Sequence, residues 1–161
     1  MSLPSAGASD PAHMRSSPPS LRTARPVAAV WTCSVGLPIR LSNVWVTCGD
    51  FVEVGTGLPD SSIGYAMLFN ILHCEQPNGL LREAWRVLAP GGTLAVMHWN
   101  YDPSTPRGPS MDIRPRSEQC RAWAVQEGFE PCGPELIDLP PYHYGLTFHK
   151  PRNGSQVRLS K

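Results

Sequence analysis

The segment that most constrains the fold is residues 77–99, PNGLLREAWRVLAPGGTLAVMHW. Its first part carries apolar residues at helical spacing, and the Pro-Gly-Gly that follows cannot continue a helix. Proline lacks an amide hydrogen, and glycine supplies the positive φ that a tight exit from a helix needs. The apolar run after it has the length and composition of a buried strand. We therefore predict a helix that reverses directly into a strand.

This helix is expected to begin near Pro77 or Asn78, with Asn78 available as its cap. Five apolar residues share one face of it: Leu80, Leu81, Ala84, Trp85 and Leu88. The charged residues of the segment fall on the opposite face, as expected for a helix that covers a sheet.

Upstream of the helix, residues 63–73 read IGYAMLFNILH, an almost wholly apolar run of strand length. Such a run is typical of a strand that is buried on both faces of a sheet. Strand, helix and strand then form a βαβ unit, in which the two strands run parallel with a right-handed crossover. A shorter β-branched run at residues 43–51, NVWVTCGDF, predicts another strand before this unit.

The region after the second strand predicts an irregular stretch and a second helix. Residues 100–115 are too rich in proline for a regular element. A helix is expected over residues 117–127, with Ser117 as its cap. Three of its residues are expected to face inward: Cys120, Trp123 and Ala124.

The end of the core predicts two strands, at residues 136–139 and 144–149. Only PPYH separates them, which is short enough for an antiparallel hairpin. The predicted architecture is therefore an α/β fold, with a mostly parallel sheet closed by a C-terminal antiparallel hairpin.

Composition narrows the functional classes. The chain of 161 residues has the size of one domain, and its 17% of charged residues and net charge of +1 do not make the basic surface that nucleic acids require. No apolar run approaches the length of a membrane span. The five cysteines are widely spaced and lack a C-x-x-C pair, which favours isolated reduced thiols over a zinc site or disulfides. We expect a cytoplasmic protein that holds no metal and binds neither nucleic acid nor membrane.

Residues 1–42 differ from the rest of the chain. They are rich in Pro, Ser and Arg, and Asp10 is their only acid, so we expect a disordered or non-native segment. Organelle targeting is an alternative, because transit peptides share this composition. Within the segment, residues 27–31 (VAAVW) predict either a short buried strand or an apolar patch. The partial domain then spans residues 43–150, and residues 151–161 form a polar tail.

Several motifs occur in a fixed order: GDF, LPDSSIGYAMLFNILH, LLREAWRVLAPGGTLAVMHW, QEGF and a final hairpin. This order resembles the C-terminal half of class I S-adenosylmethionine-dependent methyltransferases, and its most specific part is the helix ending in Arg-Val-Leu-x-Pro-Gly-Gly after an apolar strand. The resemblance implies a Rossmann-like sheet that is N-terminally truncated in this chain. It also implies S-adenosylmethionine as the cofactor, bound over the carboxyl ends of the strands.

The resemblance assigns three residues to the cofactor. Asp50 corresponds to the acid that accepts a hydrogen bond from the adenine amino group, and Phe51 to the neighbour that packs against the adenine ring. Asn70 lies at the end of the apolar strand, where the family's chain passes the methionine portion. Without the resemblance, Asp50 would only end a strand and Phe51 would only fill the core.

The carboxyl ends of the two strands form the expected substrate side. Methyl transfer is an in-line displacement, and a base assists it when the acceptor is a hydroxyl or an amine. Imidazole can take a proton near neutral pH, so His73 is the catalytic candidate, and His98 is the other histidine considered. Trp99 and Arg107 are the substrate candidates. Each histidine could instead be a satisfied core residue, and Arg107 an ordinary loop residue.

The Gly-rich cofactor loop of the family, acid-x-Gly-x-Gly-x-Gly, is missing. The nearest match, VEVGTG at residues 52–57, stands too close to the strand that begins at Tyr65, so we interpret it as an ordinary loop. Two interpretations follow. One is a methyltransferase acting on a small-molecule acceptor, and the other is a catalytically inactive truncated fragment that acts at most as a binding or interaction module. A dehydrogenase-like nucleotide-binding domain is disfavoured, because it too needs a Gly-rich loop.

Overall fold

The computed structural model describes residues 28–31, 44–47 and 53–152. The chain divides into two units, Met1–Cys48 and Gly49–Lys161. The first unit contains β1 (Ala28–Trp31) and β2 (Val44–Thr47), which pair in parallel. A strand was predicted at β2, and at β1, within the N-terminal segment of residues 1–42, either a short strand or an apolar patch; the structure has a strand at both places.

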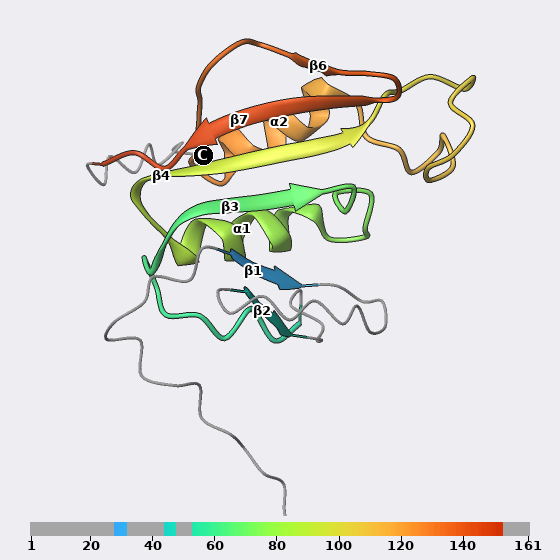
Figure 1. Ribbon diagram of the computed structural model, residues 1–161. Coiled ribbons are helices and arrows are strands. Elements are labelled where there is room, and N and C mark those ends of the chain that lie inside the picture. Colours follow the sequence, from blue (N-terminus) through green and yellow to red (C-terminus); the bar gives the residue numbers. More distant parts are fainter. Residues whose placement is uncertain (1–27, 32–43, 48–52, 153–161) are drawn as a thin grey trace, which may run out of the picture. The chain divides into compact units, whose positions relative to one another are not determined.

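The second unit holds a five-stranded sheet and two helices. Its elements in chain order are β3 (Ile63–Phe69), α1 (Pro77–Val87), β4 (Leu88–Trp99), α2 (Ser117–Gln126), β5 (Glu130–Pro131), β6 (Ile137–Leu139) and β7 (His143–His149). The strand order is β3-β4-β7-β5, and β6 also pairs with β7. β3 and β4 run parallel, whereas β7 is antiparallel to both β4 and β6. The predicted βαβ unit and the closing hairpin are therefore confirmed (Figure 1).

The junction between α1 and β4 is tighter than predicted. The helix ends at Val87 and the strand begins at Leu88, so the Pro-Gly-Gly forms an irregularity inside β4 instead of a turn before it. Backbone hydrogen bonds explain the difference: the Gly91 N–H donates to the Lys150 carbonyl over 2.7 Å, and the Lys150 N–H donates to the Gly92 carbonyl over 2.9 Å. Gly91 has a φ of 79°, in the region that favours glycine.

The apolar face of α1 is as predicted, but its cap is not. Leu80, Leu81 and Ala84 are buried against the sheet. The N-cap position belongs to Gln76, and Asn78 lies inside the helix, where its Nδ2 donates to Oε1 of Gln126 over 3.5 Å. Asn78 does not act as a cap because the helix begins with the proline before it, a residue that suits the first helical position.

Both helices cover the same face of the sheet, behind the strands in Figure 1. The opposite face of β3 carries Tyr65, Met67 and Phe69, which are 54%, 49% and 45% exposed. The prediction that this strand is buried on both faces is therefore wrong for the residues that the structure describes. The physical reason is that α1 and α2 both pack on the face of Ala66 and Leu68.

The second helix also begins differently from the prediction. Arg116 occupies the N-cap position, and Ser117 is the first helical residue. Cys120 and Ala124 face inward and are fully buried, whereas Trp123 is only partly buried. No helix in the described part of the chain is long and apolar enough to cross a membrane.

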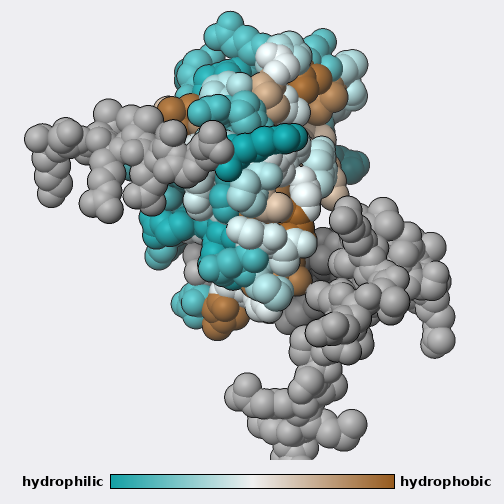
Figure 2. Space-filling view, turned by 90° about the vertical axis from the view of Figure 1, so that its left-hand side faces the viewer, coloured by the Kyte–Doolittle hydropathy of each residue, from teal (hydrophilic) through white to brown (hydrophobic). Residues whose placement is uncertain are grey.

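The VEVGTG segment forms a loop, as predicted, from the point where the structure describes it. The loop is tied to α1 through Thr56, whose N–H and Oγ1 both donate to Oε1 of Glu83. Arg86 binds the same carboxylate and also donates to Asp60 and to the carbonyl of Leu58. Figure 2 views the molecule from the left-hand side of Figure 1, where β3 and β4 begin, and its coloured surface is mostly hydrophilic.

Candidate functional site

A group of polar side chains meets where β3 and β4 end. Asn70 follows β3 directly and adopts a φ of 53°, a left-handed conformation that asparagine tolerates better than most residues. Its N–H donates to the Met97 carbonyl over 2.8 Å, which fixes the backbone against β4. Its Nδ2 lies 3.4 Å from Nε2 of His143. Its Oδ1 is buried and has no hydrogen-bond partner among the described residues.

His73 lies a few residues further along, against the end of β4. Its Nδ1 is 3.3 Å from Nε2 of His98, and the two rings meet edge to face with centroids 5.4 Å apart. His98 is 0% exposed, while His73 is partly exposed. Nδ1 of His98 is a second buried atom without a hydrogen-bond partner of regular geometry in the described part of the chain. The structure thus joins the two histidines that the sequence marked separately.

Burial keeps both imidazoles neutral. It lowers the pKa of His73 below the ordinary 6.5. Burial and then the nearby His73 lower the pKa of His98 to about 4. At neutral pH the pair is therefore uncharged, and His73 is available to take a proton.

Trp99 stands next to this group but faces the loop that follows β4. Its ring lies 4.2 Å from that of His143, at an interplanar angle of 38°. On the loop side it packs against Gly108, where an added Cβ would come within 2.9 Å of the indole. Trp99 therefore connects the Asn70–His143 pair to the loop.

That loop is organised by Arg114, a buried residue that sequence reasoning missed. Its five N–H groups donate to four backbone carbonyls, at distances of 2.7–3.3 Å. The acceptors are Asn100, Asp102, Arg107 and Pro109. Only the planar fork of arginine can satisfy so many acceptors at once. No pattern of hydrophobic periodicity could have identified it, because it lies in an irregular segment.

Arg107, a predicted substrate residue, is exposed, and only its carbonyl takes part in this network. Among the described contacts, none joins its side chain to Asn70 or His73. The two remaining predictions, Asp50 and Phe51, lie outside the described residues. The structure therefore brings Asn70, His73 and Trp99 to one edge of the sheet, and leaves the side chain of Arg107 in solvent.

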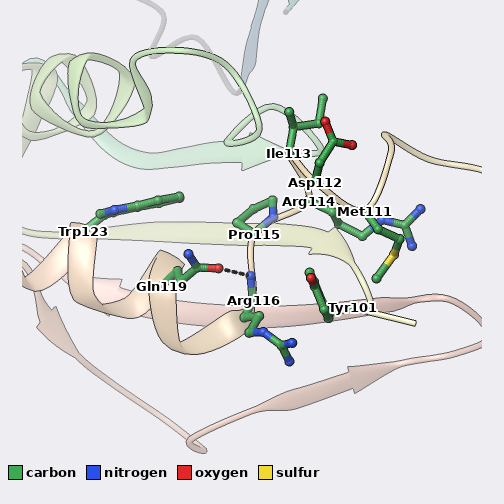
Figure 3. Close-up of a pocket in the computed structure, with 9 residues that line it drawn as sticks. All are labelled: Tyr101, Met111, Asp112, Ile113, Arg114, Pro115, Arg116, Gln119 and Trp123. Carbon is green, nitrogen blue, oxygen red and sulfur yellow. Dashed lines mark hydrogen bonds between the residues drawn. The ribbon is translucent and has the colours of Figure 1, made fainter. Parts of the chain in front are cut away.

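A cavity of about 390 Å³ opens between the loop after β4 and the start of α2 (Figure 3). The guanidinium of Arg116 lies 3.7 Å above the centre of the Tyr101 ring, and the Arg116 N–H donates to Oε1 of Gln119 over 2.9 Å. Trp123 of α2 and Met111 of the loop add apolar surface. Neither predicted substrate residue lines this cavity.

Two further ionisable groups near His98 are inert. Burial raises the pKa of the Cys120 thiol to about 11, and burial also raises the pKa of the Tyr144 hydroxyl. The two lie 3.3 Å apart, and Tyr144 Oη donates to the Pro115 carbonyl over 3.2 Å. A buried neutral thiol is no nucleophile.

In the part of the chain that the structure describes, Cys74, Cys120 and Cys132 are free, and no group of three or more metal-ligating side chains occurs.

Comparisons with known proteins concern the type of domain and the fold. Residues 24–96 match a family model described as a methyltransferase domain. No curated protein sequence matches the chain.

Solved structures of similar fold include a SAM-dependent methyltransferase from Aquifex aeolicus. It is 20% identical to this chain in sequence, with a TM-score of 0.59, and the match covers 68% of this chain and 56% of the Aquifex protein. A proposed type 11 methyltransferase from Sulfolobus solfataricus is 20% identical with a TM-score of 0.57, and the match covers 76% of this chain and 67% of that one. The [4+2]-cyclase SpnF is 19% identical with a TM-score of 0.57, and the match covers 70% of this chain and 57% of the cyclase.

At these identities the structural likeness establishes the fold alone. The match spans little more than half of the Aquifex protein and of the cyclase. The family match adds the sequence relation, because it runs across β1, β2, β3 and α1 into β4. Residues 24–96 are thus similar to a methyltransferase domain, and the fold is that of the class I S-adenosylmethionine-dependent methyltransferases.

Proposed function

We propose that the chain binds S-adenosylmethionine, the cofactor of the methyltransferases that it resembles, at the carboxyl ends of β3 and β4. In this proposal it transfers the methyl group to a small-molecule acceptor. The observation that carries the proposal is the buried, unpartnered Oδ1 of Asn70 beside a neutral His73. In open α/β sheets ligands bind at this edge of the strands.

Asn70 fits the methionine portion of the cofactor. An amide oxygen accepts hydrogen bonds, and the ammonium group of the methionine portion has only donors. A buried acceptor without a donor costs about 1–3 kcal/mol, so an ammonium group at Oδ1 of Asn70 would recover that free energy. The Asn70 backbone is fixed by its bond to Met97, so the acceptor is already in place. Asp50 and Phe51 remain our candidates for the adenine end.

His73 is the proposed base. The bound cofactor supplies an electrophilic methyl group on a sulfonium sulfur. The acceptor would bond to this carbon as the carbon–sulfur bond breaks and S-adenosylhomocysteine leaves as a neutral thioether, and Nε2 of His73 would take the proton that the acceptor hydroxyl or amine loses. Burial lowers the pKa of His73, so the ring is unprotonated at neutral pH before the reaction.

The cavity beside Tyr101 and Arg116 is the proposed entrance for the acceptor. It combines a cationic group with two aromatic rings, those of Tyr101 and Trp123, and so suits a small planar or anionic molecule. Trp99 links this loop to the Asn70–His143 pair and remains a substrate candidate. Arg107 would reach an acceptor only from the solvent side.

The alternative is an inactive fragment that binds a ligand without methyl transfer. The missing acid-x-Gly-x-Gly-x-Gly motif favours it, because the methionine and ribose ends of the cofactor would lack their usual contacts. The likeness to a protein described as a cyclase is also consistent with a fold that serves other chemistry.

A methyl-transfer assay distinguishes the two. The full chain is incubated with S-adenosylmethionine labelled in the methyl group and with a panel of phenols, amines and thiols. We expect label in at least one hydroxyl or amine product, and on the order of 10²-fold less with His73→Gln. His149→Gln is the matched control, because His149 lies at the opposite end of the sheet, paired with Glu130. A folded chain that labels none of them is the inactive fragment.

A further inference from the structure

We propose that His98 is a positioning residue. It holds His73 in the tautomer that carries its proton on Nδ1 and leaves Nε2 as a bare lone pair facing the reaction side. The inference rests on the proposed function for the use of that lone pair. The tautomer itself is a property of the chain and is measurable without any cofactor.

The geometry gives His98 little freedom. Its ring lies on the buried face of β4, the face of Leu94 and Val96, and is 0% exposed. The Tyr144 ring, whose hydroxyl is fixed to a backbone carbonyl, lies 6.3 Å away by centroids. Nε2 of His98 faces Nδ1 of His73 at 3.3 Å. A buried ring in a fixed orientation can impose a proton position on a more exposed partner.

Two neutral imidazoles that face each other share one hydrogen, so there are only two arrangements. In one, Nε2 of His98 donates, and the proton of His73 sits on Nε2, where it blocks any role as a base. In the other, Nδ1 of His73 donates, and its Nε2 is bare. The second arrangement requires the proton of His98 to sit on Nδ1.

The surroundings of His98 favour this second arrangement. Nδ1 has no hydrogen bond of regular geometry, but the Trp99 backbone raises the pKa of His98, as an acceptor near the ring does. Because Nε2 already faces His73, the nitrogen free to meet such an acceptor is Nδ1. The other ionisable neighbours, His73, His143 and Arg114, all lower the pKa of His98 and keep it neutral.

The arrangement also helps His73 to hold a proton. Once Nε2 of His73 has taken a proton, the bond from Nδ1 to His98 becomes charge-assisted and therefore stronger. His98 remains neutral, because two adjacent imidazolium ions would repel each other. This division of roles matches the burial: the inner histidine stays neutral, and the outer one titrates.

The experiment is a long-range ¹H–¹⁵N correlation spectrum of the full chain labelled in histidine, without cofactor, over a pH titration. Signals are assigned with His73→Gln. We expect His73 to be protonated on Nδ1 in the wild type. His98→Phe should shift His73 towards the tautomer protonated on Nε2 and lower its pKa. His98→Gln should restore the wild-type tautomer, because its amide oxygen can accept from Nδ1.

His149→Gln is the control and should leave the His73 signals unchanged. Circular dichroism checks that each variant folds, and His98→Gln keeps the test decisive should the phenylalanine variant unfold. A wild-type His73 protonated on Nε2 would overturn the proposal, as would an unchanged tautomer in a folded His98→Phe variant. Failure of methyl transfer alone would count against the proposed function and leave the tautomer result standing.

Discussion

Glu83 accepts two hydrogen bonds from Thr56, one from its N–H and one from its Oγ1, each over 2.6 Å. The same carboxylate binds Arg86, one turn further along α1. A loop and a helix that are separated by strand β3 in the sequence are thereby joined. This contact holds the start of the βαβ unit whose other end carries the candidate site.

Removal of this carboxylate should destabilise the fold. Glu83→Gln keeps the size of the side chain but weakens its bonds to Thr56 and Arg86, so we expect a loss of about 1–2 kcal/mol in the free energy of unfolding. Glu75→Gln, an exposed position, is the matched control and should change stability by less than about 0.5 kcal/mol. Urea unfolding measures both, and equal stabilities of the two variants would contradict the role of Glu83.

The same contact predicts a pH dependence. Bonds from Arg86 and Thr56 lower the pKa of Glu83 from 4.5 to about 2 in the folded chain. The folded pKa is depressed, so its stabilisation is fully present above about pH 4.5 and is lost as the pH falls towards 2. The stability difference between wild type and Glu83→Gln, measured by unfolding near pH 3 and near pH 7, should shrink at the lower value. A constant difference would show that Glu83 has an ordinary pKa.

Arg114 should be irreplaceable by lysine. A lysine keeps the charge but offers three donors in place of five, so buried carbonyls in the loop after β4 would lose their partners. We expect Arg114→Lys to cost about 2–3 kcal/mol and to speed hydrogen exchange in residues 100–109. Arg107→Lys, exposed in the same loop, should behave as wild type. Unchanged exchange in Arg114→Lys would contradict the account.

The pH profile of methyl transfer should reflect a buried base. As the proposed base, His73 must be unprotonated to act, so we expect the rate to fall as the pH drops through its pKa. Burial lowers that pKa below 6.5, which places the acid limb of kcat/KM below pH 6.5. His73→Gln should abolish this limb while lowering the rate. An acid limb that persists in His73→Gln would assign it to another group.

Much of the fold could be predicted from local sequence because its signals are local. The end of the helix ahead of the Pro-Gly-Gly, the apolar run of β3 and the short PPYH link each determine one connection. The first and last residues of the helices and strands were predicted less accurately. The strand after α1 begins at Leu88, because Leu88 pairs with Ile63 of β3, and it includes Gly91 and Gly92, which exchange hydrogen bonds with Lys150, a residue far away in sequence.

Only part of the candidate site could be predicted from the sequence. The position of Asn70 and His73 at the carboxyl ends of the strands could be predicted, and their role in a ligand site stays a prediction. His143 lay within the predicted turn and gave no signal, although it contacts both Asn70 and Trp99. The pairing of His73 with His98 depends on the register of β3 beside β4, which no single segment encodes.

The central claim is that the edge formed by Asn70 and His73 binds the cofactor, and calorimetric titration of the full chain with S-adenosylmethionine and S-adenosylhomocysteine tests it most directly. We predict one site of micromolar affinity for each compound. We also predict about tenfold weaker binding in Asn70→Ala and no change in Asn78→Ala, an asparagine whose side chain contacts Gln126. The claim would be contradicted if the wild-type chain, shown by circular dichroism to be folded, bound neither compound. It would also be contradicted if the Asn70→Ala variant bound both compounds as tightly as the wild type.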